Sequence, residues 1–360
     1  MRHYEERLEH DLKRIRDRIA DMAGSVEKAV ANAIHAFQTG ESELAAATIL
    51  GDHPINRAMR EIDRLCHAFI AVHLPSGAHL RLLSSAIRAN IALERIGDYA
   101  VTIARASGQL SAPPGGLMGR ELERIATEAT VMLEQSIKAF NTLNAEQART
   151  TMVLEKEMEY DLESVYSELT ANPDREKVKE LLVVFVVLTH LKRVADQAKN
   201  LCEETVFAVT GEGKVPKVYH ILFLDEDNSC LAKMAELVAR KTFPESGSYS
   251  SCGRNPAAAL DPNMVRFLES RGFDLSDASP APLDLTHAEL VDKHVIVSLE
   301  GPVRSYIQQL PFHTTALEWK TRPVPTGSFE QQPEPWEALY RDVATRIRDL
   351  IEILRGPDAP

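Results

Sequence analysis

Four polar side chains with metal-binding or hydrogen-bonding capacity recur every four residues near position 96: Asn90, Glu94, Asp98 and Thr102. In a helix this spacing places them on one face. Two carboxylates at that spacing repel each other unless a cation lies between them. Helical bundles hold metals with carboxylates from facing helices. We therefore predict a cation site at Glu94 and Asp98, with Asp52 and Glu61 as candidate further ligands. The alternative is a solvated ion cluster in which Arg88 and Arg95 neutralise the two acids.

A second acidic motif follows the apolar run 221–224, where Asp225 and Asp227 flank Glu226. This order resembles the strand and Asp-x-Asp opening of haloacid-dehalogenase-type phosphatases. In those enzymes the first Asp is the nucleophile, the second is the acid/base, and Mg²⁺ binds between them. No later acidic pair of that family is evident in this chain. The motif leaves open a Mg²⁺-dependent phosphohydrolase or a simple cation site.

The elements that carry the first motif are predicted to be long helices. Apolar residues recur at intervals of three and four from Leu8 to Ala29, which is typical of a helical-bundle seam. Gly40 ends this helix. A second helical stretch is expected from near Glu41 to before Pro75, interrupted around 51–54, and a third from about 79 to 106. The Ser-, Pro- and Gly-rich segment 107–118 is predicted to be a linker.

The helical pattern then starts again, at 119–144, 146–171 and 174–209. The β-branched run 183–187 lies inside this period, so we expect a buried helix there. The sequence LERIGD at 93–98 recurs as LKRVAD at 191–196, 98 residues later, which indicates an internal repeat of two three-helix units.

After Gly213 the pattern changes to alternating strands and helices. Strands are predicted at 218–224 and 294–299, and helices at 229–241, 263–271 and 336–354. The last helix is expected to pack on the sheet, with Trp319 and Trp336 in the core. This alternation favours an α/β domain with an open, mostly parallel sheet.

Composition narrows the functional classes. The 360 residues include 44% hydrophobic and 26% charged residues, typical of a globular protein, and the net charge of −12 argues against binding to nucleic acid. The four cysteines are scattered, so we expect free thiols in a reducing cytoplasm. The longest apolar run, 181–188, is far shorter than the ~20 residues that span a bilayer, so no membrane insertion is expected.

Residues 1–212, and above all LERIGDYAVTIA at 93–104, closely resemble the PhoU family. This resemblance implies an all-α fold of two three-helix repeats, about 1–107 and 118–210. It implies a negative regulator of phosphate-starvation signalling that acts with the ATPase of a phosphate ABC transporter and a phosphate sensor histidine kinase. A homodimer is also expected. Some members hold iron or zinc clusters, so a divalent metal or iron is the expected cofactor.

The same resemblance assigns site residues in each repeat. In the first, Glu94 and Asp98 are the family signature, with Asp52 and Asn56 facing them. In the second, Lys192 replaces the signature Glu and leaves Asp196, with Glu157 and Asp161 on the preceding helix. A lysine supplies a cation in place of a metal, so we expect metal only in the first repeat.

Residues 217–356 resemble low-molecular-weight protein tyrosine phosphatases and the related arsenate reductases, through ILFLDEDNSCLAKMAE at 221–236 and DPNMVRFLESRGFDLS at 261–276. The resemblance implies a four-stranded parallel sheet. It places Asp225 at the position of the catalytic Cys and Leu231 at that of the phosphate-binding Arg, in a degenerate phosphate loop completed by Asp227, Asn228 and Ser229. Arg322-Pro323 stands where an Asp-Pro is expected, and no redox Cys lies near Glu300.

We therefore expect no enzyme activity and interpret this region as a pseudo-phosphatase that senses an oxyanion or holds a partner. The alternatives are the phosphohydrolase centred on Asp225 and Asp227, a regulator linked to arsenate, and a helical domain that serves only as a dimerisation scaffold.

Overall fold

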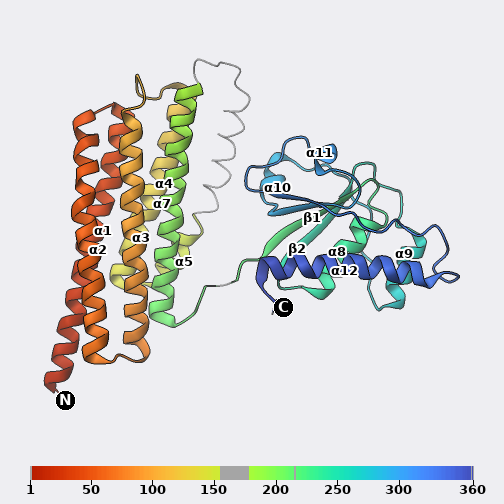
Figure 1. Ribbon diagram of the computed structural model, residues 1–360, viewed down its shortest axis with the longest axis horizontal. Coiled ribbons are helices and arrows are strands. Elements are labelled where there is room, and N and C mark those ends of the chain that lie inside the picture. The colour runs from red at the N-terminus through yellow and green to blue at the C-terminus, as the bar shows by residue number, and fades with distance from the viewer. Residues whose placement is uncertain (1, 155–177, 215, 358, 360) are drawn as a thin grey trace. The chain divides into compact units, whose positions relative to one another are not determined.

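The computed structural model describes residues 2–154, 178–214, 216–357 and 359. The chain divides into two compact units, Met1–Lys214 and Val215–Pro360. Described residues of the first unit form helices, and those of the second form a parallel sheet with helices (Figure 1). Each unit is described in turn.

Long helices joined by short connections build the first unit. They are α1 (Arg2–Thr39), α2 (Ser42–His73), α3 (Gly77–Ser107), α4 (Gly116–Thr142), α5 (Ala145–Met152) and α7 (Val178–Thr210). Gly40 follows α1 with φ +78°, a left-handed conformation that glycine adopts without strain. The segment 155–177, which contains part of the predicted helix 146–171, lies outside the described residues.

The core of this unit follows the predicted seam. Leu12, Ile15, Ile19, Met22 and Val26 of α1 are all buried. α3 packs against α1, α2 and α7, so it occupies the centre of the bundle. The run 183–187 lies inside α7, as predicted, with Val184 and Val187 buried in the helical core and Val186 exposed.

The predicted interruption of the second helix is wrong. α2 continues through Pro54 without a break. Proline removes one hydrogen bond, to the carbonyl four residues earlier. That carbonyl belongs to Leu50, whose residue is 64% exposed. Water can satisfy the free carbonyl there, so the packing of α2 on its neighbours maintains the helix across the proline.

The second unit contains a four-stranded parallel sheet in the order β2-β1-β3-β4. Its strands are β1 (Tyr219–Asp225), β2 (Gly247–Gly253), β3 (Val295–Ser298) and β4 (Thr315–Glu318). β1 pairs with β2 and β3, and the register places Asp225 opposite Gly253 at the carboxyl end of the sheet. The predicted parallel sheet is confirmed.

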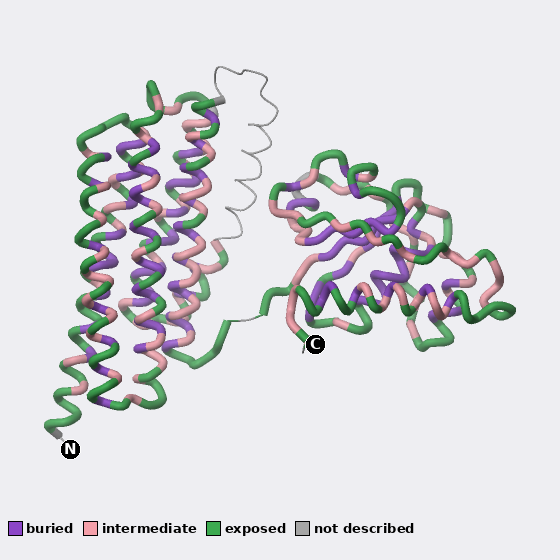
Figure 2. The backbone as a smooth tube through the Cα atoms, viewed as in Figure 1, coloured by how far each residue is buried: buried purple, intermediate pink, exposed green. Residues whose placement is uncertain are grey.

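Helices α8 (Leu231–Thr242), α9 (Pro262–Ser270) and α12 (Pro333–Arg355) contribute to a hydrophobic core that includes Ile221 and Phe223 of β1. Leu222 and Leu224 point to the other face, in a smaller core with residues of α10 (His287–Val291) and α11 (Val303–Tyr306). Figure 2 shows this concentration of buried residues around the strands. Trp336 is fully buried, as predicted, and α12 packs against α8 in the core that includes β1. Trp319 is partly buried against the same core.

All four cysteines are buried free thiols. Within the described residues, no helix combines the length and apolar character needed to cross a bilayer.

Candidate functional site

The structure brings together three of the predicted carboxylates: Asp52 of α2 and Glu94 and Asp98 of α3. Gly97 explains how the two helices approach each other here. It is buried, and a Cβ built on it would lie 3.4 Å from Ile55 Cγ2 and 3.6 Å from Asp52 Oδ1. These are van der Waals distances, so α2 packs against the turn of α3 that carries both acids. We call these three residues the acidic face.

The three carboxylates of the acidic face interact electrostatically. The pKa of Glu94 is raised, first by burial and then by the charges of Asp98 and Asp52, while Arg95 opposes the shift. The pKa of Asp98 is raised by burial and by Asp52, against an opposing effect of Arg105. Like charges raise carboxyl pKa values because each ionised group disfavours the next. A bound cation would reverse both shifts.

Asp52 is the least satisfied member of the acidic face. Its Oδ2 accepts a hydrogen bond from Asn56 Nδ2 at 2.5 Å. Its Oδ1 is buried and has no hydrogen-bond partner among the described residues. A buried acceptor without a partner is destabilising, and a carboxylate oxygen in this state is a hard donor of the kind that divalent cations prefer.

Arg88, one of the two arginines in the ion-cluster alternative, is engaged away from the acidic face. Arg88 donates to Glu204 of α7 at 2.9 Å, and its guanidinium lies 5.4 Å from the ring centroid of Phe207. Arg95 remains exposed and adjacent to Glu94. Neither Glu94 nor Asp98 forms an ion pair within 4.0 Å in the part of the chain that the structure describes. The acidic face is therefore only partly neutralised.

Glu61 does not join the acidic face. It accepts from Arg18 of α1, at 2.6 Å to Oε2 and 3.3 Å to Oε1. Glu61 follows Asp52 by nine residues, which is two and a half helical turns, so the two side chains point to opposite sides of α2. Asn90 is buried and its Nδ2 donates to the Met59 carbonyl at 2.9 Å, while its Oδ1 has no hydrogen-bond partner among the described residues.

The oxygen donors of the acidic face suit a hard divalent cation, and the unpartnered Asp52 Oδ1 is consistent with one. No complete coordination shell is assembled, however. Among the described residues, no group of three or more His, Cys, Asp or Glu side chains is arranged to hold a metal ion.

The second repeat differs at the matching position of α7. Lys192 Nζ donates to Asp196 Oδ1 at 3.0 Å, so the acid is neutralised from within its own helix. Glu157 and Asp161, the other predicted ligands, lie outside the described residues.

The loop between β1 and α8 forms the second candidate site. Asp225 ends β1 and is only 2% exposed. Its Oδ1 accepts from the Asn228 amide at 2.6 Å, and its Oδ2 accepts from the Ala232 amide at 2.8 Å. Burial raises the Asp225 pKa to about 6, although these two hydrogen bonds lower it. The charges of Glu300 and Asp227 add smaller increases.

The predicted loop residues adopt a fixed conformation. Asn228 is buried with φ +54°, and its Oδ1 accepts from the Ala281 amide at 2.9 Å. Asp227 Oδ1 accepts from the Ser229 amide at 2.8 Å. Leu231 is buried at the start of α8. The loop therefore carries carboxylates and an apolar side chain at the positions that the sequence resemblance assigns to a thiolate and a cation.

Neither cysteine of the second unit suits nucleophilic chemistry. Burial raises the pKa of the Cys230 thiol, and the charges of Asp261 and Asp225 raise it further. Burial also raises the pKa of Cys252. The thiolate is the reactive form, and both environments disfavour it.

Sequence reasoning missed several residues around this loop. Glu300 follows β3, and its Oε2 accepts from the Glu226 amide at 3.1 Å. Asn255 Nδ2 donates to Glu226 Oε1 at 2.7 Å, and the Arg254 guanidinium lies 4.5 Å from the ring centroid of Tyr306. Each of these contacts joins segments that follow different parallel strands, and parallel strands end at a common edge. The common edge of parallel strands is therefore the feature from which these contacts could have been predicted.

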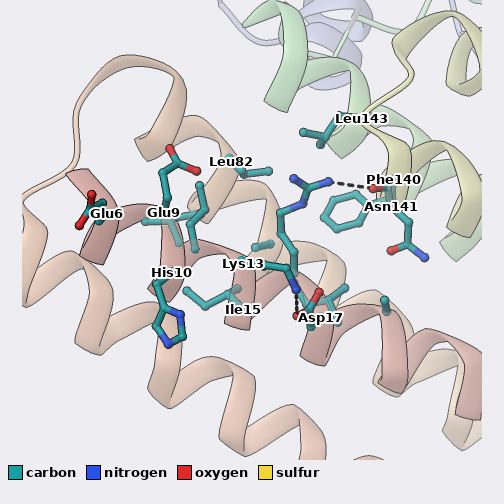
Figure 3. Close-up of a pocket in the computed structure, with 16 residues that line it drawn as sticks. Glu6, Glu9, His10, Lys13, Ile15, Asp17, Leu82, Phe140, Asn141 and Leu143 are labelled. Atoms are coloured by element: carbon teal, nitrogen blue, oxygen red, sulfur yellow. Dashed lines mark hydrogen bonds and ion pairs between the residues drawn. The ribbon is translucent and has the colours of Figure 1, made fainter. Parts of the chain in front are cut away.

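A cavity of about 580 Å³ lies in the first unit, lined by residues of α1, α3 and the end of α4 (Figure 3). Two of its charged groups are already engaged. Arg16 donates to the Asn141 carbonyl at 3.0 Å, and Lys13 pairs with Asp17 at 2.7 Å. It contains none of the predicted site residues.

Comparison with known proteins identifies the first unit. The PhoU domain family matches residues 19–107 and 122–205. A phosphate-specific transport system accessory protein PhoU homolog of Pseudomonas putida is 30% identical over 214 residues, which cover 58% of this chain and 83% of the relative. The homolog of Pseudomonas aeruginosa is 29% identical, and the match covers 88% of its length.

Solved structures give a consistent result. The crystal structure of PhoU from Pseudomonas aeruginosa is similar with a TM-score of 0.55 and 29% identity, and the match covers 57% of this chain and 99% of that one. An arsenate reductase in a phosphate-binding state matches 38% of this chain and 99% of its own, at 21% identity and a TM-score of 0.31. The repeated domain match and the coverage of the curated relatives show that the chain belongs to the PhoU family.

Proposed function

We propose that this protein is an accessory regulator of phosphate transport and of phosphate-starvation signalling in the cytoplasm. Its PhoU relatives are named as accessory proteins of the phosphate-specific transport system. By that relationship, the helical unit acts by contact with the ATPase of the transporter and with the phosphate sensor histidine kinase. It does so as a homodimer.

The observation that carries a more specific role is the asymmetry between the repeats. In the first repeat, burial and the charges of Asp98 and Asp52 raise the pKa of Glu94, and burial and the charge of Asp52 raise that of Asp98. In the second repeat, Lys192 neutralises Asp196. A divalent metal or iron ion held by the three carboxylates would neutralise the acidic face when bound. The second repeat needs no such ion at Asp196. The acidic face would then present different charges to a partner with and without metal.

The second unit acts as a non-catalytic docking module in this proposal. Both oxygens of Asp225 already accept hydrogen bonds, and Leu231 supplies no cation for a phosphate group. The buried thiols of Cys230 and Cys252 disfavour the reactive thiolate. These features support a non-catalytic role for this unit.

The contact mechanism is tested by affinity purification from cells grown in abundant phosphate. The bait is the full-length chain, and mass spectrometry quantifies the transporter ATPase and the sensor kinase. Glu94→Ala plus Asp98→Ala is expected to reduce recovery of at least one of them. Glu43→Ala, at an exposed position of α2, is the matched control. Recovery of neither partner with the wild-type bait would contradict the proposal.

A further inference from the structure

We propose that the Asp225 carboxylate is a tethered anion that occupies the anion-binding position of the loop 226–232 and closes it to free phosphate and other tetrahedral oxyanions. The inference rests on the proposal that the second unit is not catalytic. It adds a specific reason why this loop does not perceive an oxyanion.

The loop has the architecture of an anion-binding site. It connects a parallel strand to α8, a helix of 12 residues, and the amides at a helix N-terminus point toward bound anions. Here the amide of Asn228 in the loop and that of Ala232 in the first turn of α8 converge on one carboxylate. The distances are 2.6 Å to Oδ1 and 2.8 Å to Oδ2. Asp225 therefore lies where an external anion would accept these two hydrogen bonds.

Two further amides of the loop donate hydrogen bonds to carboxylates of the protein itself. The Ser229 amide donates to Asp227 Oδ1 at 2.8 Å, and the Glu226 amide donates to Glu300 Oε2 at 3.1 Å. An incoming dianion would have to displace carboxylates from these amides. It would also enter a region that already holds the charges of Asp225, Asp227 and Glu300.

The nearby arginine is engaged away from Asp225. Arg254 donates to the carbonyl and the Oγ of Ser305, both at 3.0 Å, and lies over the ring of Tyr306. Its Nη1 is 3.7 Å from Glu226 Oε2. Leu231, buried at the start of α8, adds no charge. Lys233 of α8 is buried and pairs with Glu236 at 2.8 Å. Among the described residues around the loop, these four amides and the two cations Arg254 and Lys233 are therefore already engaged by the protein's own groups.

Contacts with neighbouring segments hold the loop in this conformation. The left-handed conformation of Asn228 is fixed by the hydrogen bond from the Ala281 amide to its Oδ1. A Cβ on Gly253 would lie 2.6 Å from the Asn228 nitrogen, so β2 packs directly against the loop backbone. Because this framework does not depend on Asp225 alone, removal of the carboxylate should leave the amides oriented toward a vacant anion position.

The test compares thermal unfolding of the full-length protein in inorganic phosphate and in chloride at equal ionic strength. The variants are wild type, Asp225→Ala and a control, Asp284→Ala, at an exposed position outside the loop. The control measures the general stabilisation that phosphate gives to any folded protein. We expect wild type and the control to respond equally to phosphate. Asp225→Ala should gain about 2–4 °C more than the control when phosphate is tenfold above its Kd.

Two results would overturn the inference. One is a phosphate response of wild type that exceeds the control, because the anion position would then be open. The other is a folded Asp225→Ala protein with no excess response. If Asp225→Ala is unfolded in chloride, phosphate must restore its circular dichroism spectrum, and failure to do so also overturns the inference. Turnover of p-nitrophenyl phosphate by wild type would instead contradict the proposed function.

Discussion

Lys192 and Asp196 form an ion pair of 3.0 Å along one turn of α7, whereas the same two positions in α3 are occupied by the acids Glu94 and Asp98. The two repeats therefore share a helical framework but differ in charge at one site. In α7 the cation is a side chain, and in α3 it would have to come from solution or from a partner. The predictions below follow from this difference and from the closed loop after β1.

Metal content should depend on the first repeat. Full-length protein purified without chelator is expected to contain a divalent metal or iron, and Glu94→Ala plus Asp98→Ala should remove most of it because two of the three carboxylates are lost. Inductively coupled plasma mass spectrometry gives the metal-to-protein ratio. Asp196→Ala is the matched control in the second repeat and should leave the ratio unchanged. An unchanged ratio in the double variant would refute a metal site on the acidic face.

Replacement of the lysine should make the second repeat resemble the first. Lys192→Glu creates two acids one turn apart on α7, which repel each other. We expect a lower Tm in chelator and a partial recovery on addition of a divalent cation, larger than the recovery of wild type. Differential scanning calorimetry measures both. Equal recovery in the two proteins would show that this position does not control cation binding.

Gly97 should tolerate no branched side chain. Gly97→Val places atoms against Ile55, which lies 3.4 Å from the Cβ position, and forces α2 away from α3. Such overpacking costs about 1–3 kcal/mol of unfolding free energy, measurable by urea titration. Gly24→Val is the control, because a Cβ there meets nothing within 4 Å. Helix propensity favours valine over glycine at both positions, so a similar loss in both variants would show that the contact with Ile55 is not its cause.

Asp225 should make stability depend on pH. Its pKa is raised to about 6 from 3.8, so the folded protein binds its proton more tightly than the unfolded chain does. The stabilisation is present below pH 3.8 and is lost as pH rises through about 6. The shift corresponds to about 3 kcal/mol. Unfolding free energies at pH 4.5 and 7.5 should show a smaller difference in Asp225→Asn than in wild type. An equal difference would place the titration elsewhere.

Phosphatase activity should be absent. Wild-type protein is expected to give no hydrolysis of p-nitrophenyl phosphate above background with or without Mg²⁺, because both oxygens of Asp225 are engaged and Leu231 provides no cation. The assay is absorbance of p-nitrophenolate. Mg²⁺-dependent turnover that disappears in Asp225→Asn would establish the phosphohydrolase instead.

Periodicity predicted the long helices well because their apolar residues follow the helical repeat, as in α1. It misplaced a break at Pro54, since packing of α2 outweighs one missing hydrogen bond. The polar sequence of β2, Gly247–Gly253, has no strand periodicity. Its place beside β1 comes from long-range pairing, which local pattern does not encode.

In the candidate sites, too, local spacing could be predicted from the sequence, whereas contacts between distant segments could not. Spacing along α3 predicted that Glu94 and Asp98 share a face, and Asp52 joins them because α2 packs on Gly97. Spacing did not show that Glu61 accepts from Arg18 of α1 and lies away from the acidic face. Glu300 was missed because its contact with the loop depends on the order of strands in the sheet.

The central claim is tested most directly by a phosphate-repressed reporter, such as secreted alkaline phosphatase, in a strain that lacks this gene and grows in abundant phosphate. We predict that the reporter rises in the deletion strain and returns to its repressed level when the full-length chain is restored. A reporter that stays repressed without the gene would contradict a role in phosphate signalling.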